Sequence, residues 1–304
     1  MDHKTDVETY TMKPLAELTL LDRFLFACAM EDRGTLQLVL SIILDQEILL
    51  DEHPQSEKEL RTAPWLRSVR LDVYSMDEES RVYNTEVQKR NTGNLIKRSR
   101  FYQALIDSSL LAPGEADFNR MPSSYIITIM PFDLWNRGRY KYTFRMECQE
   151  EDGVLLEDGA IRIFLNTHGT IKEGVSEELI ELLRYMENTS DAEADRSRSD
   201  RIRELHRRVS QVKLSEEIGV RYMQEWEERI MYQAEARKKG LEEGREEGIQ
   251  EGREEGRMEG IKALILDNLE EGKSEAQILN KLERRFSLDR ESAVECLKKY
   301  SEGQ

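Results

Sequence analysis

Apolar residues recur at helical spacing over residues 19–44, on both sides of Gly34. They are Leu21, Phe24, Leu25 and Ala29 before this glycine, and Leu36, Val39, Leu40 and Ile43 after it. The pattern predicts either two helices or one helix that is broken near Gly34. Residues 51–68 are polar and contain two prolines, which predicts a loop.

Apolar and polar positions alternate over residues 69–88, which predicts the two strands of a hairpin. The acidic segment 77–80 separates the two alternating runs and is expected to form the turn. Glu86 and Gln88 share a face of the second strand because they are two residues apart. Asp72, in the first strand, joins them on that face if the hairpin pairs in a suitable register.

The sequence after the hairpin predicts a helix followed by three strands. Helical spacing returns over residues 94–111. Residues 124–130 form a continuous β-branched apolar run, typical of a strand covered on both faces, so we place it at the centre of the sheet. Residues 143–150 and 160–166 are the further predicted strands. This order of elements predicts a mixed α/β domain over residues 15–170.

The remainder of the chain is highly charged but keeps helical periodicity. Residues 171–239 are predicted to form a charged helical region, with a polar interruption at 187–200. Residues 240–260 carry a glycine at every fourth position, mostly separated by Glu and Arg. Residues 261–304 are predicted to form a small helical tail, with Ser274 as the N-cap of a helix.

The glycine repeat has two interpretations. Its six glycines would cost a helix about 6 kcal/mol relative to alanine, at about 1 kcal/mol each. Like charges four residues apart add weak repulsion. These energetics slightly favour a low-complexity linker. The alternative is a helix whose glycine seam lets a partner helix approach closely, which would make the protein a homo-oligomer. Glutamate flanks nearly every glycine, so the repeat is not a membrane dimerisation motif.

Composition narrows the class of protein. No apolar run approaches the roughly 20 residues of a membrane span, so no membrane partner is expected. The polar N-terminal segment is not expected to be a secretory signal. Cys28, Cys148 and Cys296 are far apart and form no C-x-x-C pair, so neither a disulfide framework nor a zinc site is predicted. A reducing, cytoplasmic location is expected.

The charge is unevenly distributed along the chain. The formal net charge is −16, which by itself argues against a nucleic-acid partner. Residues 61–145, however, contain 14 Lys and Arg against 9 Asp and Glu, a net charge of +5. Binding to phosphates depends on the local potential rather than on the total charge. The domain that contains the hairpin is therefore compatible with nucleic acid.

The hairpin carries candidate chemistry. Asp72 and Glu86 offer the hard oxygen ligands that Mg²⁺ prefers. Such an ion lowers the pKa of a bound water and neutralises charge on a scissile phosphate. Gln88 has an amide that can hydrogen-bond the water or the phosphate, although an amide is no general base. The alternative is that these three side chains form only the solvent-facing side of a half-exposed hairpin.

Cations follow the hairpin without an intervening acid, an arrangement that suits a phosphate backbone. They are Lys89, Arg90, Lys97, Arg98 and Arg100. Arg98 and Tyr102 are four residues apart and so share one face of the predicted helix. The alternatives are a solvated loop and helix face for the cations, and core packing for Tyr102.

These segments resemble the PD-(D/E)XK nuclease superfamily, and more specifically the recombination-promoting nuclease (Rpn) and transposase family of bacteria. The resemblance covers residues 15–170 and runs through VRLDVYSMDEESRVYNTEVQ, IKRSRFYQALIDSSLL, SSYIITIMPFDLW, YTFRMECQE and DGAIRIFLNTHG. The family pattern D…E-x-K/Q falls on Asp72, Glu86 and Gln88, with glutamine where lysine is common. The resemblance implies a restriction-endonuclease-like core, with a central mixed β-sheet flanked by helices and followed by a charged helical C-terminal extension.

The resemblance also implies a metal site for Mg²⁺ (or Mn²⁺), held by Asp72, Glu86 and the backbone carbonyl of Val87. Asp22 occupies the position of an acid that the N-terminal helix often contributes; its alternative is a surface helix residue. The resemblance places Arg98 beside the active site, in reach of phosphate.

The function that the resemblance implies is a Mg²⁺-dependent DNA endonuclease, acting in DNA recombination, transposition or defence against foreign DNA. One alternative is a catalytically silent module that binds DNA or protein and self-associates through its helical C-terminal region. A structural interaction protein without a nucleic-acid role is a third.

Overall fold

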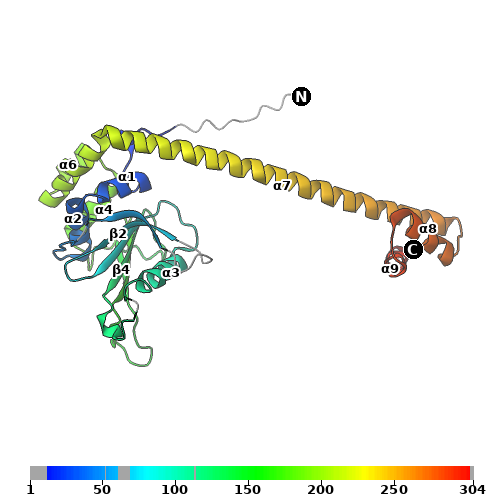
Figure 1. The fold of residues 1–304 in the computed structure, drawn as a ribbon, viewed down its shortest axis with the longest axis horizontal. Coiled ribbons are helices and arrows are strands. Elements are labelled where there is room, and N and C mark those ends of the chain that lie inside the picture. The colour runs from blue at the N-terminus through cyan, green and yellow to red at the C-terminus, as the bar shows by residue number, and fades with distance from the viewer. Residues whose placement is uncertain (1–11, 52, 61–68, 113, 302–304) are drawn as a thin grey trace. The chain divides into compact units, whose positions relative to one another are not determined.

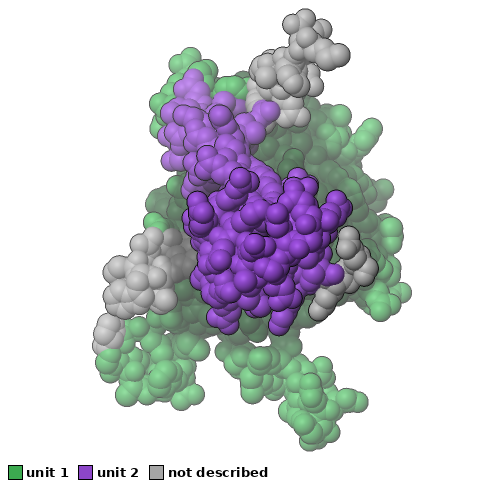
Figure 2. Space-filling model, turned by 90° about the vertical axis from the view of Figure 1, so that its right-hand side faces the viewer, with its two compact units in different colours: residues 1–226 green, residues 227–304 purple. Residues whose placement is uncertain are grey.

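The computed structural model describes residues 12–51, 53–60, 69–112 and 114–301. The chain divides into two compact units, Met1–Trp226 and Glu227–Gln304, which Figure 2 shows in different colours. None of the described helices is both long enough and apolar enough to cross a membrane.

The first unit begins with helices. A 3₁₀ helix, η1 (Leu15–Glu17), precedes α1 (Arg23–Met30) and α2 (Arg33–Leu44), so the predicted helical segment forms two helices. The break falls just before Gly34, where Asp32 caps α2 by accepting a hydrogen bond of 2.8 Å from the backbone N–H of Thr35.

A six-stranded mixed sheet follows, in the order β1-β2-β3-β4-β6-β5. Its strands are β1 (Gln55–Leu60), β2 (Val69–Met76), β3 (Val82–Val87), β4 (Ser124–Met130), β5 (Lys141–Phe144) and β6 (Ala160–Asn166). β3, β4 and β6 run parallel to one another, and the remaining pairs are antiparallel. The predicted central position of β4 and the predicted β2–β3 hairpin are both confirmed.

Two strand predictions need correction. Residues 55–60 form β1 where a loop was predicted, because the polar side chains of an edge strand face solvent and give no apolar alternation. The rest of that predicted loop, residues 61–68, lies outside the described residues. β5 ends at Phe144, although the alternation predicted a strand over 143–150; beyond it an isolated bridge pairs Glu147 with Leu155.

Helices lie on both faces of the sheet (Figure 1), and each face contributes to an apolar core. One face contributes Val73, Tyr83, Ile127 and Ile163 to the main core, which α1, α2 and later helices complete. The other face is covered by α3 (Leu95–Asp107), whose Leu105 and Ile106 pack with Tyr74, Val82 and Ile126. A second 3₁₀ helix, η2 (Phe118–Arg120), precedes β4.

The first unit extends well beyond the boundary near residue 170 that the sequence predicted. It includes α4 (Glu177–Glu187), α5 (Asp191–Arg196) and α6 (Asp200–Leu214). The apolar faces of α4 and α6 lie in the same core as the sheet, with Leu182, Tyr185, Leu205 and Val209 all buried. Because the outer faces of these helices are charged, the sequence alone did not indicate that they pack on the core. The short helix α5 lies within the predicted polar interruption.

A single long helix, α7 (Glu216–Glu270), passes through the glycine repeat. The structure therefore has a helix where the energetics slightly favoured a linker. Packed segments at both ends of α7 nucleate the helix, so the glycine repeat does not bear the cost of nucleation. Pairs at i,i+4, such as Lys238–Glu242 at 4.0 Å and Lys239–Glu243 at 3.7 Å, add weak support.

The second unit ends in a small helical core. α8 (Glu275–Phe286) and α9 (Arg290–Ser301) pack with the end of α7 through Ile261, Ile265, Ile278, Leu282 and Leu297. Ser274 is the N-cap of α8 as predicted, in a capping box where its backbone N–H donates to the Gln277 side chain at 3.1 Å.

Candidate active site

The register of the hairpin brings the two predicted acids together. β2 and β3 pair Tyr74 with Asn84 and Val73 with Thr85, and the next pair in this register sets Asp72 opposite Glu86. Each of these acids is only 3 % exposed. The interpretation of the two acids as a solvent-facing side of the hairpin is therefore wrong, because α3 and the start of α1 cover them.

Two arginines from different helices flank the acid pair. Arg23, the first residue of α1, places its Nε 2.7 Å from Oδ1 of Asp72. Arg98 of α3 places its Nη2 3.6 Å from Oε2 of Glu86. The Asn84 amide also donates to Oε1 of Glu86 at 3.3 Å. The carboxylates are thus held between the beginnings of two helices that lie far apart in the sequence.

The pair is electrostatically costly in the absence of a further cation. Burial and the neighbouring charge of Asp72 raise the pKa of Glu86 to about 7. Burial also raises the pKa of Asp72, even though Arg23 and Arg98 oppose that shift. The two arginines therefore compensate the desolvated carboxylates only in part, and a bound divalent cation would favour the ionised form of both.

The donor set of the acid pair fits a metal ion in part. Oδ2 of Asp72 is buried and has no hydrogen-bond partner, which leaves a carboxylate oxygen available as a ligand. Carboxylate oxygens are the ligands that Mg²⁺ and Mn²⁺ prefer. Among the described residues, however, no group of three or more Asp, Glu, His or Cys side chains lies close enough together to hold a metal ion.

Asp22, the predicted additional ligand, stands directly before α1 and beside Arg23. Its carboxylate is 2.8 Å from Nζ of Lys89 in an ion pair, so the start of α1 is tied to the end of β3. Asp22 thus lies near the acid pair in the fold but is engaged by a lysine. Its metal role stays a prediction.

Gln88 follows β3 directly, on the strand face of Glu86. Its backbone N–H donates to the carbonyl of Ile129 at 2.8 Å, which continues the pairing of β3 with β4 past Val87. The side chain is half-buried. The contact of its amide with water or phosphate stays a prediction.

Tyr102 and Arg98 share a face of α3 as predicted. Tyr102 packs on the core, whereas Arg98 contacts the acid pair. The guanidinium carbon of Arg98 lies 5.7 Å from the centroid of the Tyr102 ring. Tyr102 packs against the core beneath α3. Burial and the charge of Glu86 raise the pKa of its hydroxyl. Arg98 extends from this support to the acid pair.

The five predicted phosphate-binding cations fall into two groups. Lys89 and Arg98 are engaged by Asp22 and Glu86. Arg90, Lys97 and Arg100 have exposed side chains, and none of the three has a carboxylate partner among the described residues. These three are available to an anionic ligand.

The structure adds two residues that the sequence reasoning missed. Arg23 was available from the sequence as a charge beside Asp22 in an otherwise apolar segment. Glu57 gave no signal. It has φ +52° in β1, interrupts the ladder opposite Asp72, and pairs with Arg23 at 3.5 Å and Arg70 at 3.0 Å. Non-glycine residues with positive φ concentrate at functional sites.

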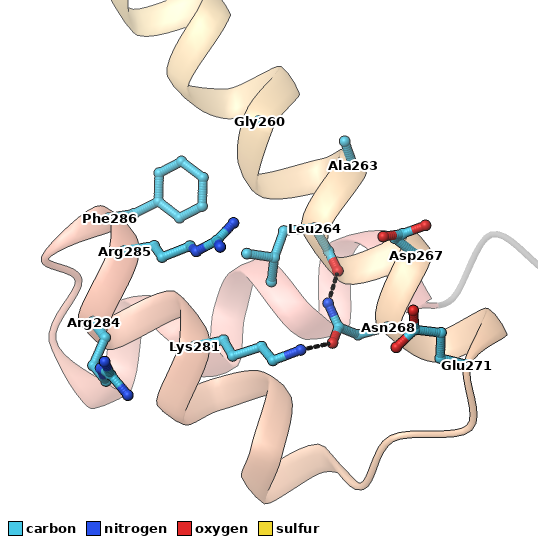
Figure 3. Close-up of a pocket in the computed structure, with 10 residues that line it drawn as sticks. All are labelled: Gly260, Ala263, Leu264, Asp267, Asn268, Glu271, Lys281, Arg284, Arg285 and Phe286. Atoms are coloured by element: carbon cyan, nitrogen blue, oxygen red, sulfur yellow. Dashed lines mark hydrogen bonds between the residues drawn. The ribbon is translucent and has the colours of Figure 1, made fainter.

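A separate cavity of about 840 Å³ lies in the second unit, between the end of α7 and α8 (Figure 3). Asp267 and Glu271 line one side, and Arg284, Arg285 and Phe286 line another. Acidic and basic side chains both line the cavity, so its charge favours no class of ligand. None of the predicted site residues lines it.

The model of the PD-(D/E)XK nuclease family transposase family matches residues 24–242, more than half of the chain. The chain belongs to this family. The match includes the acid pair, α3, the sheet and α4 to α6, and it begins just after Asp22 and Arg23. No curated protein and no solved structure matches the sequence. The six-stranded mixed sheet flanked by helices agrees with the restriction-endonuclease-like fold, and the family supports a nuclease-like function.

Proposed function

We propose that this PD-(D/E)XK family protein is a metal-dependent DNA endonuclease whose centre is Asp72 and Glu86. The observation that carries the proposal is the juxtaposition of two buried carboxylates on adjacent strands, one with an unpartnered oxygen. A hairpin that served only for stability would gain more from an apolar pair at these positions.

Each residue of the candidate site has its own role in the proposed hydrolysis of a phosphodiester. Asp72, Glu86 and the backbone carbonyl of Val87 would hold Mg²⁺ or Mn²⁺, which supplies water activation and neutralises phosphate charge. Gln88 orients the attacking water through its amide. Arg98, already 3.6 Å from Glu86, reaches a phosphate bound at the pair. Arg90, Lys97 and Arg100 hold the flanking backbone. In the cell, such an enzyme would act in recombination, transposition or defence against foreign DNA.

A catalytically silent DNA- or protein-binding module is the second candidate. It is favoured by Gln88, which stands where a lysine is common, and by the guanidinium of Arg23 on Asp72. In this candidate the arginines neutralise the acids permanently, and the helical C-terminal region mediates self-association.

Plasmid cleavage separates the two candidates. The full chain is incubated with supercoiled DNA and Mg²⁺ or Mn²⁺, alongside Asp72→Ala, Glu86→Ala and the control Glu78→Gln, an exposed acid in the same hairpin. We expect nicking or linearisation by the wild type and the control, and at least a 100-fold loss in both alanine variants. Cleavage that persists in both would reject the site. Salt-sensitive DNA binding without cleavage by the wild type would favour the silent module.

A further inference from the structure

The loop that follows β4 (residues 131–140, here the β4–β5 loop) leaves the sheet beside the candidate active site. β3, β4 and β6 are parallel, so their C-terminal ends share one edge of the sheet. Gln88, at the end of β3, is bonded to Ile129 near the end of β4. Neighbouring strands lie about 4.8 Å apart. The loop therefore starts one strand away from Gln88.

A network of hydrogen bonds centred on one carboxylate orders this loop. The carboxylate of Asp133 accepts hydrogen bonds from the backbone N–H groups of Trp135 (3.0 Å), Arg137 (2.8 Å) and Gly138 (2.7 Å). It also accepts one of 2.6 Å from the hydroxyl of Tyr142. Three backbone donors and a hydroxyl on one carboxylate fix the course of the loop.

Gly138 closes the loop against the residues that follow β6. It has φ +74°, and a Cβ at this position would lie 2.7 Å from Oγ1 of Thr170. Its carbonyl accepts from the backbone N–H groups of Thr170 (2.7 Å) and Ile171 (2.9 Å). Only glycine combines this backbone conformation with so close an approach.

Aromatic packing sets the loop against the start of α3. Trp135 packs at a tilted angle against Tyr142 and Phe144, at centroid distances of 4.7 and 4.8 Å, and meets Phe164 edge-on at 5.3 Å. Leu95, the first residue of α3, lies in the same cluster. The loop thus adjoins the helix start that presents Lys97, Arg98 and Arg100.

Arg137 and Arg139 project from this ordered loop. Both side chains are exposed, and neither has a carboxylate partner among the described residues. Together with Arg90, Lys97 and Arg100 they bring unpaired positive charge to one edge of the sheet. Gathering like charges on pre-ordered elements is unfavourable without a polyanion to neutralise them.

We propose that Arg137 and Arg139 form a second phosphate-binding surface of the enzyme, which holds the DNA backbone beside the scissile phosphate. The inference rests on the proposed function, because it takes DNA as the ligand. The acid pair then acts on a duplex held on both sides, by the β3–α3 cations and by the β4–β5 loop.

The test measures the salt dependence of DNA binding by the full chain. Binding of a fluorescent duplex is followed by anisotropy, in EDTA, for Arg137→Gln, Arg139→Gln and the double variant. Arg145→Gln is the matched control, because Arg145 is an exposed arginine that follows the other end of β5. Lys141 pairs with Leu165 and Phe144 with Arg162, so Arg145 lies toward the opposite edge of the sheet.

We expect the slope of log K against log salt to fall by about 1 for each single variant and by about 2 for the double variant. We also expect roughly tenfold weaker binding in the double variant near physiological salt. Arg145→Gln should leave slope and affinity unchanged. The cleavage rate of Arg145→Gln should also equal that of the wild type, since Arg145 belongs neither to the acid pair nor to the β4–β5 loop.

A double variant with the wild-type slope overturns the inference. If the wild type still cleaves DNA in that case, only the role of the loop is rejected and the proposed function stands. If the wild type neither binds nor cleaves DNA, the proposed function fails, and the loop inference fails with it. An equal loss in Arg145→Gln would also reject the inference, because it would show a general charge effect.

Discussion

Glu86→Gln should stabilise the protein while removing its activity. The pKa of Glu86 is raised from 4.5 to about 7, so the folded state holds this proton more tightly than the unfolded state. Stability of the wild type therefore falls as pH rises through this window. The shift corresponds to about 3 kcal/mol, at about 1.4 kcal/mol for each pH unit. Glutamine is neutral and of the same size, so the variant avoids this cost at pH 8.

The contacts that Glu86 makes as a carboxylate reduce the stability gain expected of the glutamine variant. Glutamine loses the attraction of Arg98, which is 3.6 Å away and partly exposed, but it can still accept from Asn84. We therefore expect a gain between about 1 and 3 kcal/mol at pH 8. At pH 4.5 the gain should shrink toward zero, because the wild-type carboxyl is then mostly protonated in the folded state.

Urea unfolding in EDTA measures this difference. Trp135 and Trp226 belong to the first compact unit, and the sequence of the second unit contains no tryptophan, so tryptophan fluorescence reports on the unit that contains the site. Glu78→Gln, in the exposed turn of the same hairpin, is the control and should be neutral. A Glu86→Gln variant no more stable than the wild type at pH 8 would refute the electrostatic reasoning.

Further predictions concern the metal and the C-terminal helices. Asp72→Asn should abolish Mn²⁺ binding measured by calorimetry, whereas the control Asp51→Asn, at an exposed acid outside the hairpin, should bind Mn²⁺ normally. Arg23→Gln should tighten Mn²⁺ binding several-fold, because it removes a cation 2.7 Å from Asp72; weaker binding would show that Arg23 instead positions the ligand. A chain that ends at Lys239 lacks the glycine-repeat helix. If this helix joins two copies, light scattering should give the truncated chain half or less of the full-length mass. An unchanged ratio of measured mass to chain length would count against self-association through the repeat.

Local periodicity was sufficient to predict the hairpin and the face shared by the acids. Alternation with a period of two assigns Asp72, Glu86 and Gln88 to faces, and a short turn restricts the register of the strands. The continuous apolar run of β4 likewise predicted its central place in the sheet. These features depend on residues close together in the sequence.

Burial of the acid pair could not be predicted in the same way. It depends on α1 and α3, which contribute Arg23 and Arg98 from either side of the hairpin in the sequence. β1 escaped detection for a related reason, since an edge strand with polar side chains lacks the alternation that marks a half-buried strand. Helix α6 looked like a solvated extension because only one face of it enters the core.

The acid pair destabilises the fold, and this supports a functional role for it. Asp72 is buried with an unpartnered oxygen, Glu86 has a raised pKa, and Glu57 adopts a positive φ beside them. Each feature opposes stability, and an apolar pair at the same positions would remove the first two. Such features gather at functional sites, and a bound cation would stabilise both desolvated carboxylates at once. Arginine alone leaves the pKa of both acids raised, whereas the divalent metal of the proposed function would favour the ionised form of both.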